Sequence, residues 1–189
     1  MAHWRAVVVA AAVALASCAA IAPPAQDGGA FVPLPDASFE IAGRLSARRG
    51  DDGVAASYRW RHQPAFDEFV FASPMGGSLA RLSGVPGSVR LERTDGGVAE
   101  AGDWQTLASE VLGAPLPVDG LAWWVRASPR PGSAFRAEPD ASGRLSVLRQ
   151  DGWEIVYAYR GSDRRPARLT LAFADVELRL VVDTESGVP

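Results

Sequence analysis

Few side chains in this chain of 189 residues could carry out covalent or acid–base chemistry. It has one cysteine, Cys18, and no lysine, so all 19 basic residues are arginines and Schiff-base mechanisms are excluded. His62 is the only histidine after residue 17, and its place at the end of an alternating run, beside Gln63-Pro64, predicts a surface side chain. A Ser-His-Asp site could use only that histidine, and a zinc site needs more His or Cys ligands than the chain offers. The sequence therefore gives no positive reason to expect an enzyme or a metal site.

Cys18 ends the segment Leu15-Ala16-Ser17-Cys18, which has the residue order of a bacterial lipobox, the signal at which a cysteine is acylated and the chain is cut just before it. Arg5 and the apolar run 6–16 complete a signal-peptide plan, and the run is shorter than the roughly 20 residues that span a bilayer. We therefore predict a signal peptide at 1–17 and a lipid on Cys18. The alternative is an unmodified thiol beside an ordinary cleavage site. Ala19, rather than Asp, follows the cysteine, and by resemblance to such lipoproteins this favours the outer membrane, on its periplasmic side.

The rest of the chain divides into a tether and one domain. Residues 18–37 are rich in Ala, Pro and Gly, which predicts a lipid-anchored tether. Residues 38–189 are long enough to bury one core and are predicted to form a single domain. The net charge is −3 and no long basic run occurs, which argues against a nucleic-acid partner.

Alternation of apolar and polar residues predicts a mainly β domain. Strands are predicted within 39–47, 56–61, 66–72, 79–83, 89–93, 145–147, 153–159, 169–173 and 176–182. Between the two groups of strands, apolar residues recur at helical spacing in 104–112, with Asp103 at the N-cap and Gly113 after the end. A second short helical stretch begins near Pro117. One apolar face per strand and only two helices indicate a curved antiparallel sheet or barrel with a helical insert.

Large aromatic residues fall on the predicted inner face of this sheet. Tyr58 and Trp60 alternate in one strand, and Trp153 and Tyr157 in another. A cup lined by these rings could hold an acyl chain, or the rings could fill a solid core. Periodicity alone favours the core, because the inward faces of small barrels are usually filled by side chains.

Several segments together resemble the outer-membrane lipoprotein receptor and insertion factor of the Lol system, the LolB family. The resemblance runs over most of the chain from Phe39 to Asp183 and rests on the order and spacing of the segments, together with the lipobox. These segments are Gly43-Arg44-Leu45, Trp60, Ser73-Pro74-Met75-Gly76, Leu112-Gly113, Leu116-Pro117-Val118, Leu121, Trp124, Gln150-Asp151-Gly152-Trp153 and Tyr157.

The resemblance implies a half-open antiparallel β-barrel with a short helical lid over an apolar cavity. Family members accept lipoproteins from a related soluble periplasmic carrier, which is LolA-like, and insert them into the outer membrane without nucleotide, metal or other cofactor. The implied partners are this carrier, acylated lipoprotein cargo and outer-membrane lipid. An acyl-binding cavity reverses the preference for a solid core. The implied cavity residues are Tyr58, Trp60, Leu121, Trp124, Trp153 and Tyr157.

The resemblance also points to a loop. In the family, an apolar residue exposed on the loop after the third strand inserts into the membrane and is needed to deliver cargo. The matching residues here are Pro74, Met75 and Gly76, with Met75 where relatives commonly have Leu. Met is also apolar and flexible, so the role can be kept; the alternative is a Met folded back onto the barrel. Elsewhere, Ala127 stands where relatives tend to have Gly, and the tail after Asp183 lacks a terminal Trp often found there.

Two functions from different classes follow from these patterns. The first is a transport protein that accepts lipoproteins and inserts them into the outer membrane. The alternative is a structural or assembly lipoprotein of the outer membrane that binds a protein partner and holds no lipid. A lipid-cleaving enzyme is more distant, given the poor catalytic inventory. Only the first function requires an apolar cavity and an exposed Met75.

Overall fold

The computed structural model describes residues 31–187, so Cys18 and the predicted signal peptide lie outside it. Two helices, α1 (Trp104–Leu112) and α2 (Val118–Trp124), separate two groups of strands. The strands are β1 (Phe39–Arg49), β2 (Asp52–Gln63), β3 (Phe66–Ala72), β4 (Ser78–Val85), β5 (Ser88–Arg93), β6 (Val98–Ala101), β7 (Phe135–Pro139), β8 (Leu145–Gln150), β9 (Trp153–Tyr159), β10 (Pro166–Phe173) and β11 (Val176–Ser186).

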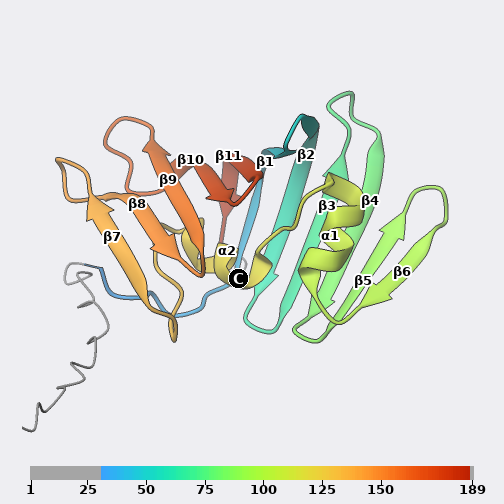
Figure 1. Ribbon diagram of the computed structural model, residues 1–189, viewed down its shortest axis with the longest axis horizontal. Helices are drawn as coiled ribbons and strands as arrows, with labels where there is room; N and C mark the ends of the chain where they lie inside the picture. The colour runs from blue at the N-terminus through green and yellow to red at the C-terminus, as the bar shows by residue number, and fades with distance from the viewer. Residues whose placement is uncertain (1–30, 188–189) are drawn as a thin grey trace, which may run out of the picture.

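All the strands form one antiparallel sheet of 11 strands in the order β6-β5-β4-β3-β2-β1-β11-β10-β9-β8-β7. The first and last strands pair at its centre, and the helical insert leaves β6 and β7 as its two edges. The sheet therefore curves without closing, and both helices lie on the same side of it (Figure 1). This confirms the prediction of a mainly β, half-open antiparallel barrel with a short helical segment.

Alternation within the strands gives the sheet a buried inner face and a charged outer face. In β1, Ile41 and Leu45 are buried while Arg44 is exposed. On the outer face, arginine and glutamate side chains of neighbouring strands lie close together. For example, Glu40 Oε1 of β1 lies 3.8 Å from Arg59 Nε of β2. Such exposed pairs contribute little to stability, so the fold depends mainly on the apolar core between the inner face and the helices.

Helix α1 begins and ends at the predicted residues, and α2 begins where it was predicted. The Asp103 carboxylate accepts a hydrogen bond from the Thr106 backbone N–H at 2.8 Å, and Gly113 ends α1 with φ 68°. Helix α1 packs against β2, β4, β5 and β6. Pro117 directly precedes α2, as its position in the sequence predicted. The insert therefore covers the inner face of the sheet.

The edge strands β6 and β7 were not predicted. Both are short, and their inward positions carry small or half-buried residues such as Ala99 and Ala137, so their apolar alternation is weak. They form because β5 and β8 offer unpaired backbone groups at each end of the sheet. Pairing with a neighbour thus decided their structure more than their own sequence did.

The centre of the sheet has a close contact that requires glycine. The pairing of β1 with β11 shifts register between Ala42 and Gly43, and a Cβ added at Gly43 would lie 1.9 Å from the Val181 carbonyl oxygen. The Tyr58 hydroxyl, from the residue paired with Gly43 in β2, donates a hydrogen bond to that same oxygen at 3.2 Å. The family segment Gly43-Arg44-Leu45 therefore includes the residue that lets the first and last strands meet.

Candidate functional site

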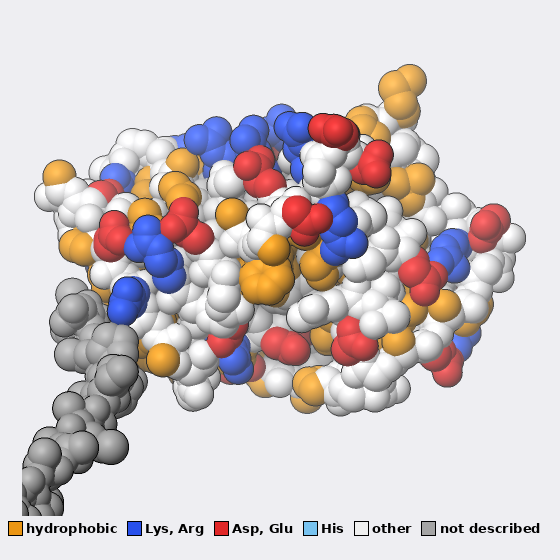
Figure 2. Space-filling view, viewed as in Figure 1, with side chains coloured by type: hydrophobic (Ala, Val, Ile, Leu, Met, Phe, Trp, Pro, Cys, Tyr) orange, Lys and Arg blue, Asp and Glu red, His pale blue; other side chains and the backbone are white. Residues whose placement is uncertain are grey.

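The loop between β3 and β4 presents Met75 to solvent with 96% of its surface exposed. The loop is closed by backbone hydrogen bonds from Ser73 N to Gly77 O at 2.7 Å and from Gly76 N to Ser73 O at 2.9 Å. Gly76 has φ 94°, a left-handed conformation that suits glycine. Figure 2 shows an apolar projection at the upper right, where Figure 1 places the β3–β4 connection. The turn therefore holds an apolar side chain away from the body of the protein.

Apolar surface continues from this loop onto the outer face of the sheet. A depression of about 280 Å³ is lined by Pro74 together with Ala55 and Val181, and Arg44 and Arg179 also border it. Several outer-face positions in this sheet carry long charged side chains, but here Ser46, Ala55 and Ser57 are small. Pro74 belongs to both the loop and the lining of this depression, so the two lie side by side.

The six predicted cavity residues all point into the interior and come from three elements. They are Tyr58 and Trp60 of β2, Leu121 and Trp124 of α2, and Trp153 and Tyr157 of β9, and each is 7% exposed or less. Trp60 stacks on Phe69 with ring centroids 4.7 Å apart, whereas Trp153 packs against Phe173 at 5.2 Å. In the structure, all six side chains therefore pack within one apolar interior. Their role as lipid contacts stays a prediction.

Gln150, buried at the end of β8, fixes α2 to the sheet. Its side-chain oxygen accepts hydrogen bonds from Trp124 Nε1 at 2.9 Å and from the Arg130 backbone N–H at 2.7 Å. Its amide nitrogen donates to the carbonyl oxygens of Arg130 at 2.8 Å and Ser133 at 3.2 Å. A buried amide with all these partners satisfied is a specific contact. This role was not predicted, since only the segment's family resemblance drew attention to Gln150.

Gly120 leaves room for the Trp124 ring within α2, because a Cβ added there would lie 2.4 Å from Trp124 Cζ2. We expect Gly120→Ala to lower the free energy of unfolding by about 1–2 kcal/mol. Overpacking costs about 1–3 kcal/mol, and the higher helix propensity of Ala offsets up to about 1 kcal/mol. Urea unfolding followed by tryptophan fluorescence measures the change. A variant as stable as the parent would show that the ring does not need this space.

Comparison with known proteins identifies the family. The family model described as outer membrane lipoprotein LolB matches residues 37–184. The outer-membrane lipoprotein LolB of Thiobacillus denitrificans is 38% identical over 184 residues, which cover 97% of this chain and 98% of that protein. The protein of the same name from an Azoarcus species is 34% identical over 172 residues, covering 89% and 88%. A LolA superfamily crystal structure from Nitrosomonas europaea aligns at 10% identity over 87% of this chain and 92% of that chain, with a TM-score of 0.47.

The chain belongs to the LolB family. It is therefore an outer-membrane lipoprotein of the Lol system, and LolB is not an enzyme family. Among residues 31–187, neither helix has the length and apolar character to cross a membrane. Acylation of Cys18 stays a prediction, because that residue lies outside the described part of the chain.

Ala127 has a backbone conformation that few residues other than glycine adopt. Its φ is 52°, and its N–H donates to the Trp124 carbonyl oxygen at 3.0 Å. This left-handed conformation ends the turns after α2 and costs a non-glycine residue roughly 1–2 kcal/mol. The turn after α2 therefore holds Ala127 in a strained conformation.

Tyr157 has an unusual environment for a tyrosine in this LolB interior. The hydroxyls of Tyr58 and Tyr159 donate to the carbonyl oxygens of Val181 and Leu145, but the Tyr157 hydroxyl has no hydrogen-bond partner among the described residues. Burial raises its pKa well above the ordinary value, so the phenol stays protonated. The residue therefore places an unpaired polar group in an apolar interior.

We expect Tyr157→Phe to raise the free energy of unfolding by about 1 kcal/mol, because the variant no longer buries an unpaired hydroxyl. Tyr159→Phe is the matched control. It removes a hydrogen bond of 2.6 Å to the Leu145 carbonyl oxygen and should lower the same quantity. Thermal and urea unfolding of both variants measure the direction of each change in stability. A loss of stability in Tyr157→Phe would show that the hydroxyl is not unpaired.

The prediction that His62 lies at the surface is wrong. The residue is 4% exposed, and its ring stacks on the Phe39 ring with centroids 4.9 Å apart. Its ring nitrogens lie 2.8 Å from Asp67 Oδ1 and 2.8 Å from Asp36 Oδ1. Burial lowers the pKa of His62, but the hydrogen bonds to Asp67 and Asp36 outweigh burial and the pKa is raised. His62 faces the inner side because it continues the alternation of Tyr58 and Trp60.

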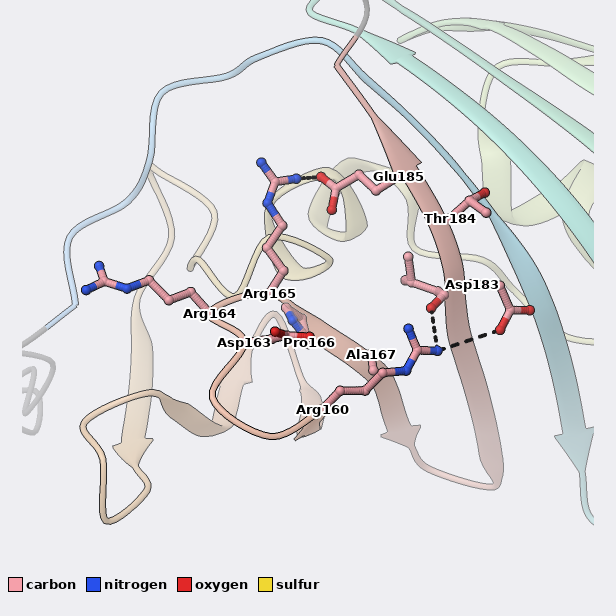
Figure 3. A pocket seen from close by; sticks show the side chains of 10 residues that line it. Arg160, Asp163, Arg164, Arg165, Pro166, Ala167, Asp183, Thr184 and Glu185 are labelled. Carbon is pink, nitrogen blue, oxygen red and sulfur yellow. Dashed lines mark hydrogen bonds and ion pairs between the residues drawn. The ribbon is translucent and has the colours of Figure 1, made fainter.

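A second, polar pocket of about 350 Å³ lies between the β9–β10 connection and the end of β11. Arg160 donates to the Val182 carbonyl oxygen at 3.2 Å and lies 3.8 Å from Asp183, and Arg165 pairs with Glu185 (Figure 3). These arginines are engaged by neighbours inside the pocket. The contacts hold the long β9–β10 connection against β11.

Proposed function

We propose that this LolB-family chain accepts acylated lipoproteins from a LolA-like soluble carrier and delivers them to outer-membrane lipid through the Pro74-Met75-Gly76 loop. In this proposal the chain is held at the membrane by a lipid on Cys18 and the tether that follows it. The acyl chains of the cargo lie against the inner face of the sheet beneath α2. Tyr58, Trp60, Leu121, Trp124, Trp153 and Tyr157 form the apolar contacts.

The exposure of Met75 is the observation that carries this proposal. Transfer of an apolar side chain that is 96% exposed from water into lipid is favourable. A loop closed by its own hydrogen bonds can present this side chain without unfolding. The apolar depression beside Pro74 extends the surface that would meet lipid. The driving force for transfer of the acyl chains is the difference in affinity for them between the carrier, this chain and the membrane, so no nucleotide is needed.

A transfer experiment tests acceptance. With Cys18→Ala the chain cannot carry a lipid at residue 18, and it keeps every described residue. It is mixed with an acylated lipoprotein bound to its soluble carrier, and the two complexes are then separated by size. We expect the cargo to move to this chain, while a cargo variant without acyl chains does not. Cargo that stays on a carrier competent toward another acceptor would favour the alternative, a lipoprotein that binds a protein partner and holds no lipid.

A further inference from the structure

The residues just before β1 cross the end of α2. The Leu34 N–H donates to Ser128 Oγ at 2.9 Å, and Trp123 Nε1 donates to the Leu34 carbonyl oxygen at 3.2 Å. Arg126 Nη1 donates to the Pro35 carbonyl oxygen at 3.0 Å. These contacts join residues 89 to 94 positions apart in sequence, and we call residues 34–36 the strap. In Figure 1 the blue segment before β1 passes the lower ends of β7 and β8 and reaches the region of α2.

His62 fixes the strap to the sheet. Its Nε2 lies 2.8 Å from Asp36 Oδ1, and its Nδ1 lies 2.8 Å from Asp67 Oδ1 on β3. Asp67 Oδ1 also accepts a hydrogen bond from Trp60 Nε1 at 2.6 Å, so the carboxylate is held from two sides. The strap is therefore bound at one end by α2 and the residues after it, and at the other by a buried histidine of β2.

This arrangement controls access to the apolar interior. Leu121 and Trp124 of α2 are 0% and 1% exposed, so an acyl chain cannot reach the inner face beneath α2 unless the helix moves. Trp123, on the same helix, is hydrogen-bonded to the strap. Movement of α2 away from the sheet must break that contact or carry the strap with it, and Asp36 opposes the second course.

We propose that the strap holds α2 over the inner face of the sheet and that His62 is its positioning residue, so that release of the strap precedes uptake of an acyl chain. The inference rests on the proposed function, because it assigns the step that opens the proposed lipid site. The strap also lies within the predicted tether 18–37, so the segment proposed to connect the domain to the membrane includes the residues that cover its helix.

The chemistry of the contact gives the strap a pH dependence. Carboxylates accept hydrogen bonds only, so His62 can donate to both Asp36 and Asp67 only as the imidazolium. The surrounding pocket of about 350 Å³ also contains Asp119 of α2 and Arg130, and Arg126 faces Asp36 from beyond α2.

The sign follows from the direction of the shift. The pKa of His62 is raised above the unfolded value of 6.5, so its contribution to holding the strap is complete below pH 6.5 and is lost as pH rises through the raised pKa. Above that pKa one ring nitrogen turns a lone pair toward a carboxylate. The strap should then release more readily, and uptake should become faster with rising pH.

Three variants separate these roles. Asp36→Asn keeps a hydrogen bond in both protonation states, because an amide both donates and accepts, so we expect slow uptake that no longer changes with pH. Asp36→Ala removes the contact, and uptake should be about tenfold faster than the parent at low pH and independent of pH. Trp123→Phe removes the N–H that donates to Leu34, together with one of the two fused rings, and uptake should be about fivefold faster at every pH. Asp52→Ala, an exposed carboxylate at the start of β2, is the matched control and should behave as the parent.

Two readouts are made on the exported chain with Cys18→Ala. The first is the uptake rate of a fluorescent peptide whose N-terminal cysteine carries acyl chains, measured between about pH 6 and pH 9. The second is amide hydrogen exchange of α2 without any ligand, which should be faster in Asp36→Ala and Trp123→Phe and unchanged in Asp36→Asn at low pH.

The two readouts keep the inference distinct from the proposed function. Uptake by the parent that is independent of pH, or exchange of α2 unaltered in Asp36→Ala and Trp123→Phe, would overturn the role of the strap even if the peptide binds. A parent that never binds the acylated peptide would overturn the proposed function. The exchange measurement would still decide whether the strap restrains α2.

Discussion

Met75→Glu is expected to stop delivery of cargo to membranes while leaving the fold and the acceptance of cargo intact. Met75 is 96% exposed and its side chain makes almost no contact with the domain, so the substitution costs little folding free energy. Without the methionine side chain, the loop loses about 2 kcal/mol of the favourable free energy of burial in lipid. This loss alone lowers the rate of release more than tenfold. A carboxylate in the apolar layer adds a further penalty. We therefore expect release into vesicles to fall at least about thirtyfold.

The measurement is transfer of labelled cargo from the preloaded chain to lipid vesicles. Met75→Leu restores an apolar side chain and should keep the parent rate. Val85→Glu places the same charge at the other end of β4, at a position 39% exposed, and should also deliver normally. If Met75→Glu delivered as fast as Val85→Glu, the loop would have no special part in insertion.

Gly43→Ala is expected to destabilise the protein by at least about 3 kcal/mol, at the upper end of overpacking costs. The added Cβ would lie 1.9 Å from the Val181 carbonyl oxygen, and that neighbour is backbone, which cannot rotate away. Relief requires β1 and β11 to separate, which disturbs the Tyr58 hydrogen bond and the central pairing of the sheet. A domain stable by about 5–15 kcal/mol would lose a large share of its stability.

Urea unfolding followed by tryptophan fluorescence measures this loss. Gly53→Ala is the matched control, since an added Cβ there would first meet Arg48 Cγ at 3.3 Å, an atom of a flexible side chain. The control should change stability by about 0.5 kcal/mol or less, as expected for a surface position. Equal effects of the two substitutions would show that the β1–β11 contact has no special demand for glycine.

Local signals in the sequence predicted most of the architecture. Asp103 and Gly113 define α1 because a cap is a contact between near neighbours in the chain. Alternation likewise places Tyr58 and Trp60 on the inner face. The exposed Met75 follows from a turn whose Pro and Gly residues leave nothing for the side chain to pack against. Each of these inferences needs only a short stretch of sequence.

Contacts between distant segments could not be predicted in the same way. His62 has the position of a strand end, but Asp36 and Asp67 supply partners that let a titratable ring be buried. Gln150 is a polar residue in a strand, and its role depends on Trp124, 26 residues away in the helical insert. The alternation within a strand predicts which face of the sheet a residue occupies. It does not show which distant residues pack against that face.

The central claim is that acyl chains enter the interior beneath α2, and a photoreactive acyl chain tests it most directly. An acylated peptide with a diazirine along one acyl chain is loaded onto the Cys18→Ala chain and illuminated, and the attached residues are mapped by mass spectrometry. The account predicts adducts on inner-face residues, among them Leu121, Trp124 and Trp153. Adducts confined to the outer depression around Ala55 and Val181, with the inner face unlabelled, would contradict it.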